Sequence, residues 1–142
     1  MPLPSFTETA KCLDNKRLGK QRVEAYQIFL ALTTNKGWVN HPATKMWKGH
    51  ERALCEYGLD ICDEWMKRGY RDTLFNKFLK FNHSLYKKGH SREYPKWMGD
   101  TKFHAAHRSN LLRKNPDWYS KYNWKENDNL PYIWPTKELI KN

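Results

Sequence analysis

The amino-acid sequence predicts an all-α fold in a single domain. Between positions 44 and 68, apolar residues recur at spacings of 3, 4 and 7, as a helix with one buried face requires. No segment alternates apolar and polar residues with the period of two that marks a half-buried strand. The 142 residues contain no internal repeat and no Gly/Ser linker, and chains usually divide only well above about 200 residues. We expect a compact domain of about three to five helices.

The N-terminal third predicts a short helical turn followed by a long helix. Ser5 or Thr7 is suited to cap the first turn, with Glu8 as the capping-box partner of Ser5. From Asp14 to Thr33 the chain has no proline, and apolar residues in the second half recur at steps of three and four. The sequence 35–37, Asn-Lys-Gly, is typical of a helix end. This helix is therefore basic in its first half and apolar in its second.

The strongest helical pattern predicts one continuous helix from Thr44 to Arg68. It ends in Lys-Arg-Gly, a basic last turn followed by a glycine. A shorter helix is expected from Thr73 to Tyr86, and residues 87–99 are expected to form a loop. The apolar stripe of the long helix comprises Met46, Ala53, Leu54, Tyr57, Ile61 and Trp65.

The last predicted helix begins at a cap formed by Asp100 or Thr101 and runs to Lys114. The sequence 115–117, Asn-Pro-Asp, breaks it and starts a short aromatic turn. Beyond this turn, Pro131 and Pro135 indicate an extended or irregular tail.

The net charge of +11, from 26 Lys and Arg against 15 Asp and Glu, indicates a polyanionic partner. The basic residues gather at 11–22 and 77–96, which favours nucleic acid over a merely solvated surface. The longest apolar run, residues 28–32, is far shorter than the roughly 18 residues of a membrane span. Three cysteines without a CxxC pair argue against a disulfide scaffold or zinc ribbon. We expect a soluble, cytoplasmic, monomeric protein, either nucleoid-associated or in a virus-infected cell.

The N-terminus and the first long helix contain two groups with possible acid–base and nucleophilic chemistry. A small second residue ordinarily permits removal of Met1, which would make Pro2 the α-amine. An α-amine has a pKa of about 7.7–8.0, so a neutral, nucleophilic fraction exists near neutral pH. Helical periodicity places Glu24 on one face with Arg17 and with Lys20 or Gln21. Glu24 either neutralises this basic face or acts in acid–base chemistry, for example by stabilising an oxocarbenium ion.

The helix after position 100 and the aromatic tail offer further binding candidates. His104 and His107 lie on one helical face, where they suit a metal, a phosphate or base contact, or core hydrogen bonding. No third metal ligand is evident nearby, so we expect no metal. Arg108 and Ser109 suit contacts to phosphate and sugar. Aromatic rings either stack on bases or cover the core, and we expect one or two to face a ligand. The aromatic residues of the tail are Trp118, Tyr119, Tyr122, Trp124, Tyr132 and Trp134.

Three segments, in order along the chain, resemble the pyrimidine-dimer DNA glycosylases, the family of the endonuclease V of T-even phages and its bacterial relatives. Residues 62–70 resemble the family's central helix and its Lys-Arg-Gly-aromatic exit. Residues 104–122 resemble its C-terminal helix and aromatic tail, and residues 13–24 are similar to the stretch with its catalytic glutamate. The resemblance covers about residues 4 to 122.

The resemblance implies a DNA glycosylase with coupled apurinic-site lyase activity, acting without a metal or other cofactor on double-stranded DNA with damaged pyrimidines or a modified base. The family's α-amine nucleophile falls on Pro2 and its glutamate on Glu24, with Arg17 and Arg22 as phosphate clamps. The relative we compare has a primary amine, but a secondary amine also forms an iminium. The full set of expected DNA contacts is Lys16, Arg17, Lys20, Gln21, Arg22, His104, His107, Arg108, Ser109, Arg113 and Lys121, with Trp118, Tyr119 and Tyr122 expected to stack on bases.

Three alternatives remain at this level. The first is a binding module for DNA or RNA on the same fold, without a functional amine. The second is an enzyme of the same fold that acts on a modified base in place of a UV photoproduct. The third is a metal-dependent nuclease that uses His104 and His107.

Overall fold

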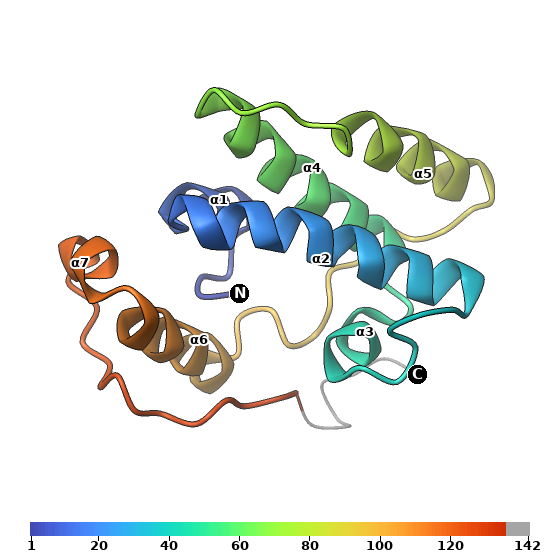
Figure 1. Ribbon diagram of the computed structural model, residues 1–142. Coiled ribbons are helices and arrows are strands. Elements are labelled where there is room, and N and C mark those ends of the chain that lie inside the picture. The colour runs from blue at the N-terminus through green and yellow to red at the C-terminus, as the bar shows by residue number, and fades with distance from the viewer. Residues whose placement is uncertain (136–142) are drawn as a thin grey trace.

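In the computed structural model, which describes residues 1–135, all regular secondary structure is helical (Figure 1). Four helices have at least 13 residues, and the others are one or two turns long. The all-α prediction is therefore confirmed. The structure has more helices than the three to five expected, because several of them are short. The elements are α1 (Phe6–Cys12), α2 (Asn15–Thr34), α3 (Pro42–Trp47), α4 (Glu51–Lys67), α5 (Phe75–Lys87), α6 (Thr101–Lys114), α7 (Pro116–Tyr119) and the 3-10 helix η1 (Ser120–Tyr122).

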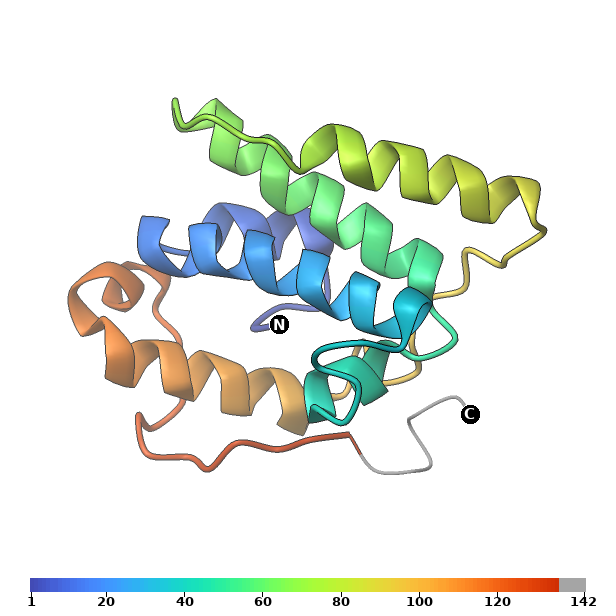
Figure 2. The same cartoon turned by 45° about the vertical axis from the view of Figure 1, so that its right-hand side comes forward.

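Helix α4 lies at the centre of one half of the molecule and packs against α1, α2 and α5. Helix α6 lies on the other side of α1 and α2, and the chain after η1 runs beneath α6 towards α3 (Figures 1 and 2). The N-terminal residues enter between α2 and α6 (Figure 2). This arrangement brings the first residues of the chain, the first long helix and the tail around one interior region.

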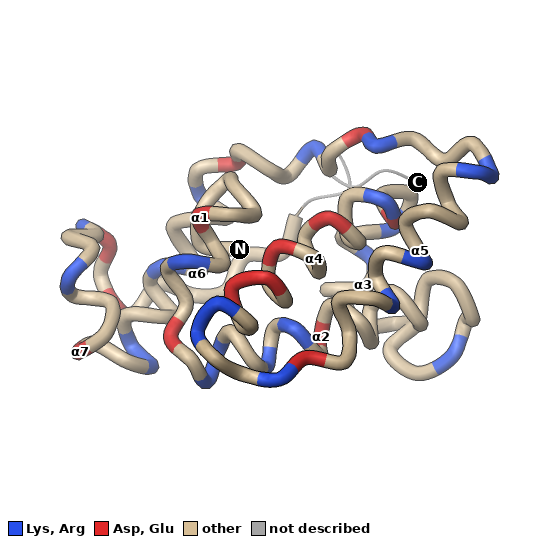
Figure 3. Tube along the Cα trace, turned by 90° about the horizontal axis from the view of Figure 1, so that it is seen from above, with Lys and Arg blue, Asp and Glu red and all other residues tan. Residues whose placement is uncertain are grey.

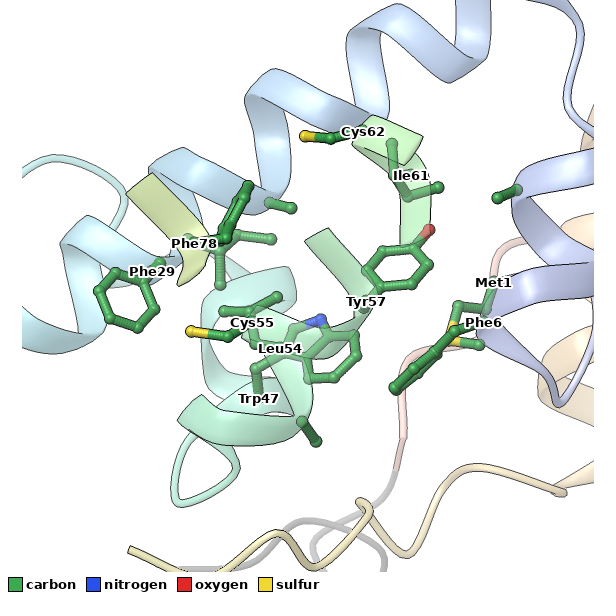
Figure 4. Close-up of a cluster of buried hydrophobic side chains, with 14 of the residues drawn as sticks. Met1, Phe6, Phe29, Trp47, Leu54, Cys55, Tyr57, Ile61, Cys62 and Phe78 are labelled. Carbon is green, nitrogen blue, oxygen red and sulfur yellow. The ribbon is translucent and has the colours of Figure 1, made fainter. Parts of the chain in front are cut away.

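The core is built on the buried stripe of α4, as the apolar spacing predicts. Leu54 and Ile61 have no exposed surface, and Tyr57 is 2% exposed. Around them pack rings from other elements, including Phe6 of α1 and Trp47 of α3 (Figure 4). Aromatic side chains thus supply much of the core volume, which fits a chain with 15% aromatic residues.

The prediction of one continuous helix from Thr44 to Arg68 is wrong, because the chain breaks into α3 and α4 at residues 48–50. Gly49 has a φ of +85°, a conformation that only glycine adopts without strain. His50 then turns inward, where it is 1% exposed and its Nδ1 lies 2.9 Å from the Glu93 carbonyl oxygen. The apolar periodicity continues across the break, and so it does not reveal the turn.

The remaining predicted elements agree with the structure to within about two residues at each end. Ser5 caps α1 by accepting a hydrogen bond from the Glu8 backbone N–H at 3.2 Å. Asp100 caps α6 by accepting one from the Phe103 backbone N–H at 3.0 Å. Asn35 ends α2 in the left-handed conformation, and the tail up to Pro135 is irregular. Local capping chemistry therefore sets most helix ends here.

Close packing of α4 on α5 gives a first prediction. A Cβ atom added at Gly58 would lie 2.6–2.7 Å from three atoms of the fully buried Phe78 ring. Alanine's helix propensity favours Gly58→Ala by roughly 1 kcal/mol, but overpacking typically costs about 1–3 kcal/mol. We expect a net loss of stability of up to about 2 kcal/mol, measured by urea unfolding. Ser84→Ala on the exposed side of α5 is the control, and a Gly58→Ala protein more stable than wild type would contradict this packing.

Candidate active site

A cavity of about 480 Å³ lies where α2, α3, α6, the N-terminus and the tail meet. Its size falls within the range of about 300–1,000 Å³ that is usual for small-molecule sites. Its lining residues are Met1, Pro2, Leu13, Lys16, Arg17, Lys20, Gln21, Glu24, Ile28, Trp38, His41, Ala43, Met46, Trp47, Tyr57, Trp97, His107, Asn110, Leu111, Lys114, Tyr132 and Trp134.

One face of α2 supplies the polar wall of this cavity. Arg17, Gln21, Glu24 and Ile28 follow one another at steps of four, three and four, so their side chains project from the same side of the helix. Lys20 also lines the cavity, so the predicted common face of α2 is present. Basic side chains dominate this wall, and within residues 1–135 Glu24 is the one carboxylate that lines the cavity.

Glu24 is half-buried, and it forms no hydrogen bond or ion pair with any other residue in the described part of the chain. Its expected neutralising partner Arg17 instead pairs with Asp14, at 3.3 Å between Nη1 and Oδ2. A carboxylate without a fixed partner in a basic cavity can respond to a positive charge that develops on a ligand. This arrangement favours the acid–base interpretation of Glu24 over simple charge balance.

Helix α6 holds the N-terminal backbone at the cavity. The ring Nδ1 of His104 lies 2.9 Å from the Met1 carbonyl oxygen, and Arg108 donates a hydrogen bond of 2.9 Å to the Pro2 carbonyl. The Met1 α-amine lies 3.1 Å from Nδ1 of His107. These three side chains are on one face of α6, at positions i, i+3 and i+4. The paired histidines therefore position the N-terminus in this structure.

Burial changes the protonation of this region. It lowers the pKa of the Met1 α-amine to about 5, although the negative charge of Glu24 opposes that shift. It also lowers the pKa of His107 well below its ordinary value, with the nearby amine charge acting in the same direction. Both groups are thus mainly neutral at pH 7, and they share one hydrogen bond whose donor is set by the tautomer of His107.

Several predicted DNA contacts have other partners in the structure. Arg22 faces away from the cavity and pairs with Asp72 at 2.6 Å. His104 accepts a hydrogen bond of 2.9 Å from the Gly99 backbone N–H through Nε2, in addition to its contact with Met1. Arg108 also pairs with Glu126. Such buried polar contacts favour structural roles, because DNA contact would require these bonds to be exchanged.

The tail-side candidates are also engaged within the protein. The Ser109 hydroxyl accepts from the Leu130 backbone N–H and donates to the Asn127 carbonyl. Arg113 bonds to Asn110 and to the Asp128 carbonyl. These contacts fasten the segment 127–130 to α6, and neither Ser109 nor Arg113 lines the cavity.

The three rings that the sequence suggests for base stacking lie outside the cavity. Tyr119 is completely buried and hydrogen-bonds to Asp14, so its ring is not open to a base. Trp118 donates its indole N–H to the Cys12 carbonyl at 2.8 Å, and the Lys121 ammonium lies 3.6 Å from its ring centroid. Tyr122 stacks on Trp124. These rings therefore cover the junction of α1 and α7.

Sequence reasoning missed Trp38 and His41 of the aromatic wall, and it named Tyr132 and Trp134 only among the aromatic residues of the tail, of which one or two were expected to face a ligand. Trp38 and His41 come from the connection between α2 and α3, and Tyr132 and Trp134 come from the tail. The aromatic richness of the tail is visible in the sequence, but which rings face a ligand depends on where the tail folds back. Lys114 was missed because a basic residue at a helix end is usually only a C-terminal cap.

The second basic segment of the sequence lies away from the cavity. None of residues 77–96 lines it, and the loop after α5 packs on α4, where Arg92 pairs with Glu56 at 2.5 Å. Figure 3 shows Lys and Arg on the first half of α2 and around α5, with carboxylates gathered on α4. The two basic segments therefore form separate surfaces.

Within residues 1–135, no group of three or more His, Cys, Asp and Glu side chains is arranged to hold a metal ion. No helix in this range combines the length and the apolar character needed to cross a bilayer.

The comparison with protein families decides the identity. The family model described as pyrimidine dimer DNA glycosylase matches residues 1–77, which is more than half of the 142-residue chain. The chain belongs to this family. The matched range includes the N-terminus, α2 and α3, whereas the glycosylase-like resemblance of α6 and the tail remains a prediction. Comparison with curated proteins and with solved structures gives no significant match.

Family membership implies a DNA substrate and DNA glycosylase activity. The part of the cavity that the family match covers contains Glu24, the basic face of α2 and the N-terminal residues. Walls from α6 and the tail lie outside the matched range.

Proposed function

We propose that the protein is a DNA glycosylase with coupled apurinic-site lyase activity, which excises damaged pyrimidines, such as UV dimers, or a modified base. The observation that carries the proposal is the meeting of the N-terminal residues with Glu24 in one basic cavity. An amine nucleophile and a carboxylate in one site are the two groups that this chemistry needs.

In the proposed reaction, the N-terminal α-amine, that of Pro2 once Met1 is removed, attacks C1′ of the lesion nucleotide. The bond from C1′ to the base breaks, and the base leaves with the electron pair and takes up a proton. The sugar ring then opens, with cleavage of the C1′–O4′ bond, to give an iminium ion between the Pro2 nitrogen and C1′. Glu24 stabilises the positive charge that develops at C1′ during base loss.

The lyase step follows from the iminium ion. Glu24 accepts a proton from C2′, and the C3′–O bond breaks, so that the 3′ strand leaves as a 5′-phosphate. Water then hydrolyses the iminium and regenerates the amine. Burial at this end of the chain supports this role, since it lowers the pKa of the Met1 α-amine in the structure, and Pro2, which would bear the α-amine after Met1 is removed, is also buried.

The proposal is tested with two duplexes, one with a single thymine dimer and one with a single abasic site. We expect both to be cut at the lesion in excess chelator, leaving an unsaturated aldehyde on the 3′ end. Cleavage of the abasic duplex alone would support the lyase activity and contradict the excision of thymine dimers. Cleavage that chelator abolishes would support the metal-dependent nuclease and contradict the proposal.

The basic face of α2 is proposed to hold DNA phosphates, which gives a salt-dependence prediction. Lys20 is exposed at the cavity and has no ion-pair partner among the described residues. The plot of log K against log salt has a negative slope, and removing one phosphate contact reduces the magnitude of that slope by about 0.9. We expect this change for Lys20→Ala in duplex-binding titrations between about 50 and 200 mM salt. Lys67→Ala, which removes a lysine paired with Asp63 on α4, is the control and should leave the slope unchanged.

A further inference from the structure

Five aromatic rings form a continuous row along the cavity wall. Starting from His107 of α6, the row passes through Tyr132 and Trp134 of the tail to His41 and Trp38 in the α2–α3 connection. Successive ring centroids lie 5.7, 6.3, 6.1 and 4.9 Å apart. All five residues line the cavity.

The outer rings of this aromatic row are not part of the core. Trp38 is 37% exposed, Trp134 is 42% exposed and Tyr132 is 47% exposed, whereas Tyr119 in the same tail is completely buried. Large aromatic side chains that stay this exposed along a cavity leave part of their surface accessible to a ligand. The row therefore differs from the rings that close the junction of α1 and α7.

The cations of α2 and the rings of the α2–α3 connection lie at different ends of that helix. Lys16, Arg17 and Lys20 project from the first half of α2, whereas Trp38 and His41 follow its C-terminus. Arg17 and Ile28 are eleven residues apart, which corresponds to about 16 Å along a helix. The tail passes beneath α6 towards α3 (Figure 2), and its Trp134 ring reaches His41, with ring centroids 6.1 Å apart. Lys114 of α6 lies beside the row, with its ammonium 3.1 Å from the Tyr132 hydroxyl and 5.8 Å from that ring's centroid, so positive charge and flat apolar surface both line the cavity.

This combination fits a nucleotide that has left the base stack. Lysines and arginines hold phosphates, and aromatic faces stack on bases irrespective of sequence. A base that remains paired inside a duplex cannot reach such a wall, so the base has to be unstacked. We infer that the aromatic row is a stacking platform for an unstacked nucleobase, and that the tail segment 130–135 closes the cavity over it. This inference rests on the proposed function, because it places the base in the cavity that Glu24 also lines.

The test compares two ligands in a Glu24→Gln background, in which any turnover is strongly slowed. A single-stranded oligothymidylate supplies phosphates and unstacked bases, whereas an undamaged duplex of equal length supplies phosphates alone. Loss of one stacked base costs at least about fivefold in affinity. We expect Trp38→Ala and Tyr132→Ala each to weaken single-strand binding by about fivefold or more and to leave duplex binding unchanged.

Matched variants separate stacking from folding. Trp38→Phe retains a ring and should retain most of the single-strand affinity. Tyr86→Ala removes a more exposed ring, at 63%, on α5 outside the cavity, and it should leave the affinity for both DNA ligands unchanged. If Trp38→Ala and Tyr132→Ala lost equal affinity for both ligands, or lost no affinity for the single strand, the inference would be overturned.

A photochemical readout tests the same contact directly. An oligothymidylate with one 5-iododeoxyuridine should cross-link under irradiation to a ring of the aromatic row, identified by peptide mass analysis. Cross-links confined to other surfaces would overturn the inference. Failure of the wild-type protein to cut abasic DNA, together with ring-dependent single-strand binding, would overturn the proposed function alone. If the wild-type protein cuts abasic DNA but single-strand binding does not depend on the rings, only the stacking platform would be overturned.

Discussion

Glu24→Gln is expected to lower the rate of strand cleavage by about 10²- to 10⁴-fold, the usual contribution of a general acid–base group. Glutamine keeps the shape and some hydrogen bonding, but it has no negative charge to stabilise C1′ and no lone pair basic enough to take the C2′ proton. Because Glu24 has no hydrogen bond or ion pair to another described residue, the change leaves no orphaned partner. Single-turnover cleavage of an abasic duplex measures the effect.

Duplex binding provides the control for this variant. Removing one negative charge from a basic surface should leave DNA affinity equal or slightly higher. Glu8→Gln makes the same change at an exposed carboxylate of α1 that does not line the cavity, and it should retain the activity. Cleavage by Glu24→Gln within a few-fold of wild type would show that another group does this work.

Trp97→Ala is expected to destabilise the protein by about 3–5 kcal/mol. Trp97 has no exposed surface, packs edge-on against Trp47 with centroids 5.0 Å apart, and lies 5.1 Å from Phe103. Its indole N–H also donates a 2.9 Å hydrogen bond to the Met46 carbonyl. Since small domains have a total stability of about 5–15 kcal/mol, the melting temperature should fall by roughly 10–20 °C.

The companion variant Trp97→Phe separates the ring from its hydrogen bond. It keeps much of the aromatic volume but leaves the buried Met46 carbonyl without that donor, a cost of about 1–3 kcal/mol. Calorimetry should therefore place it between wild type and Trp97→Ala. A Trp97→Ala protein that melts within about 3 °C of wild type would contradict the packing around α3.

The sequence is most informative where the signal is local. Helix caps at Ser5 and Asp100 and the common face of α2 follow from short-range rules, and all of them are present. The break at Gly49 is not visible, because apolar spacing continues through a turn that a left-handed glycine makes possible. Periodicity reports which face is buried, and it does not require that the backbone be continuous.

The site was predictable only in its first half. Glu24 and the cations around it share one helix, so spacing alone brings them together. The contacts of His104 and Arg108 with the N-terminal carbonyls join residues more than 100 positions apart, which no spacing rule describes. The same holds for Tyr132 and Trp134, whose place depends on how the tail returns beneath α6. Contacts between residues far apart in the sequence, and not composition, determine which rings face the cavity.

The most direct measurement is borohydride trapping on a duplex with a single abasic site, followed by intact-mass and peptide-mass analysis. An iminium ion between the protein and C1′ is the intermediate that the proposed mechanism requires, and reduction makes it permanent. We expect a covalent protein–DNA adduct on the Pro2 nitrogen of protein that has lost Met1, formed equally well in excess chelator. An absence of adduct, with duplex binding that simply weakens as salt rises, would contradict the lyase mechanism and favour a DNA-binding module.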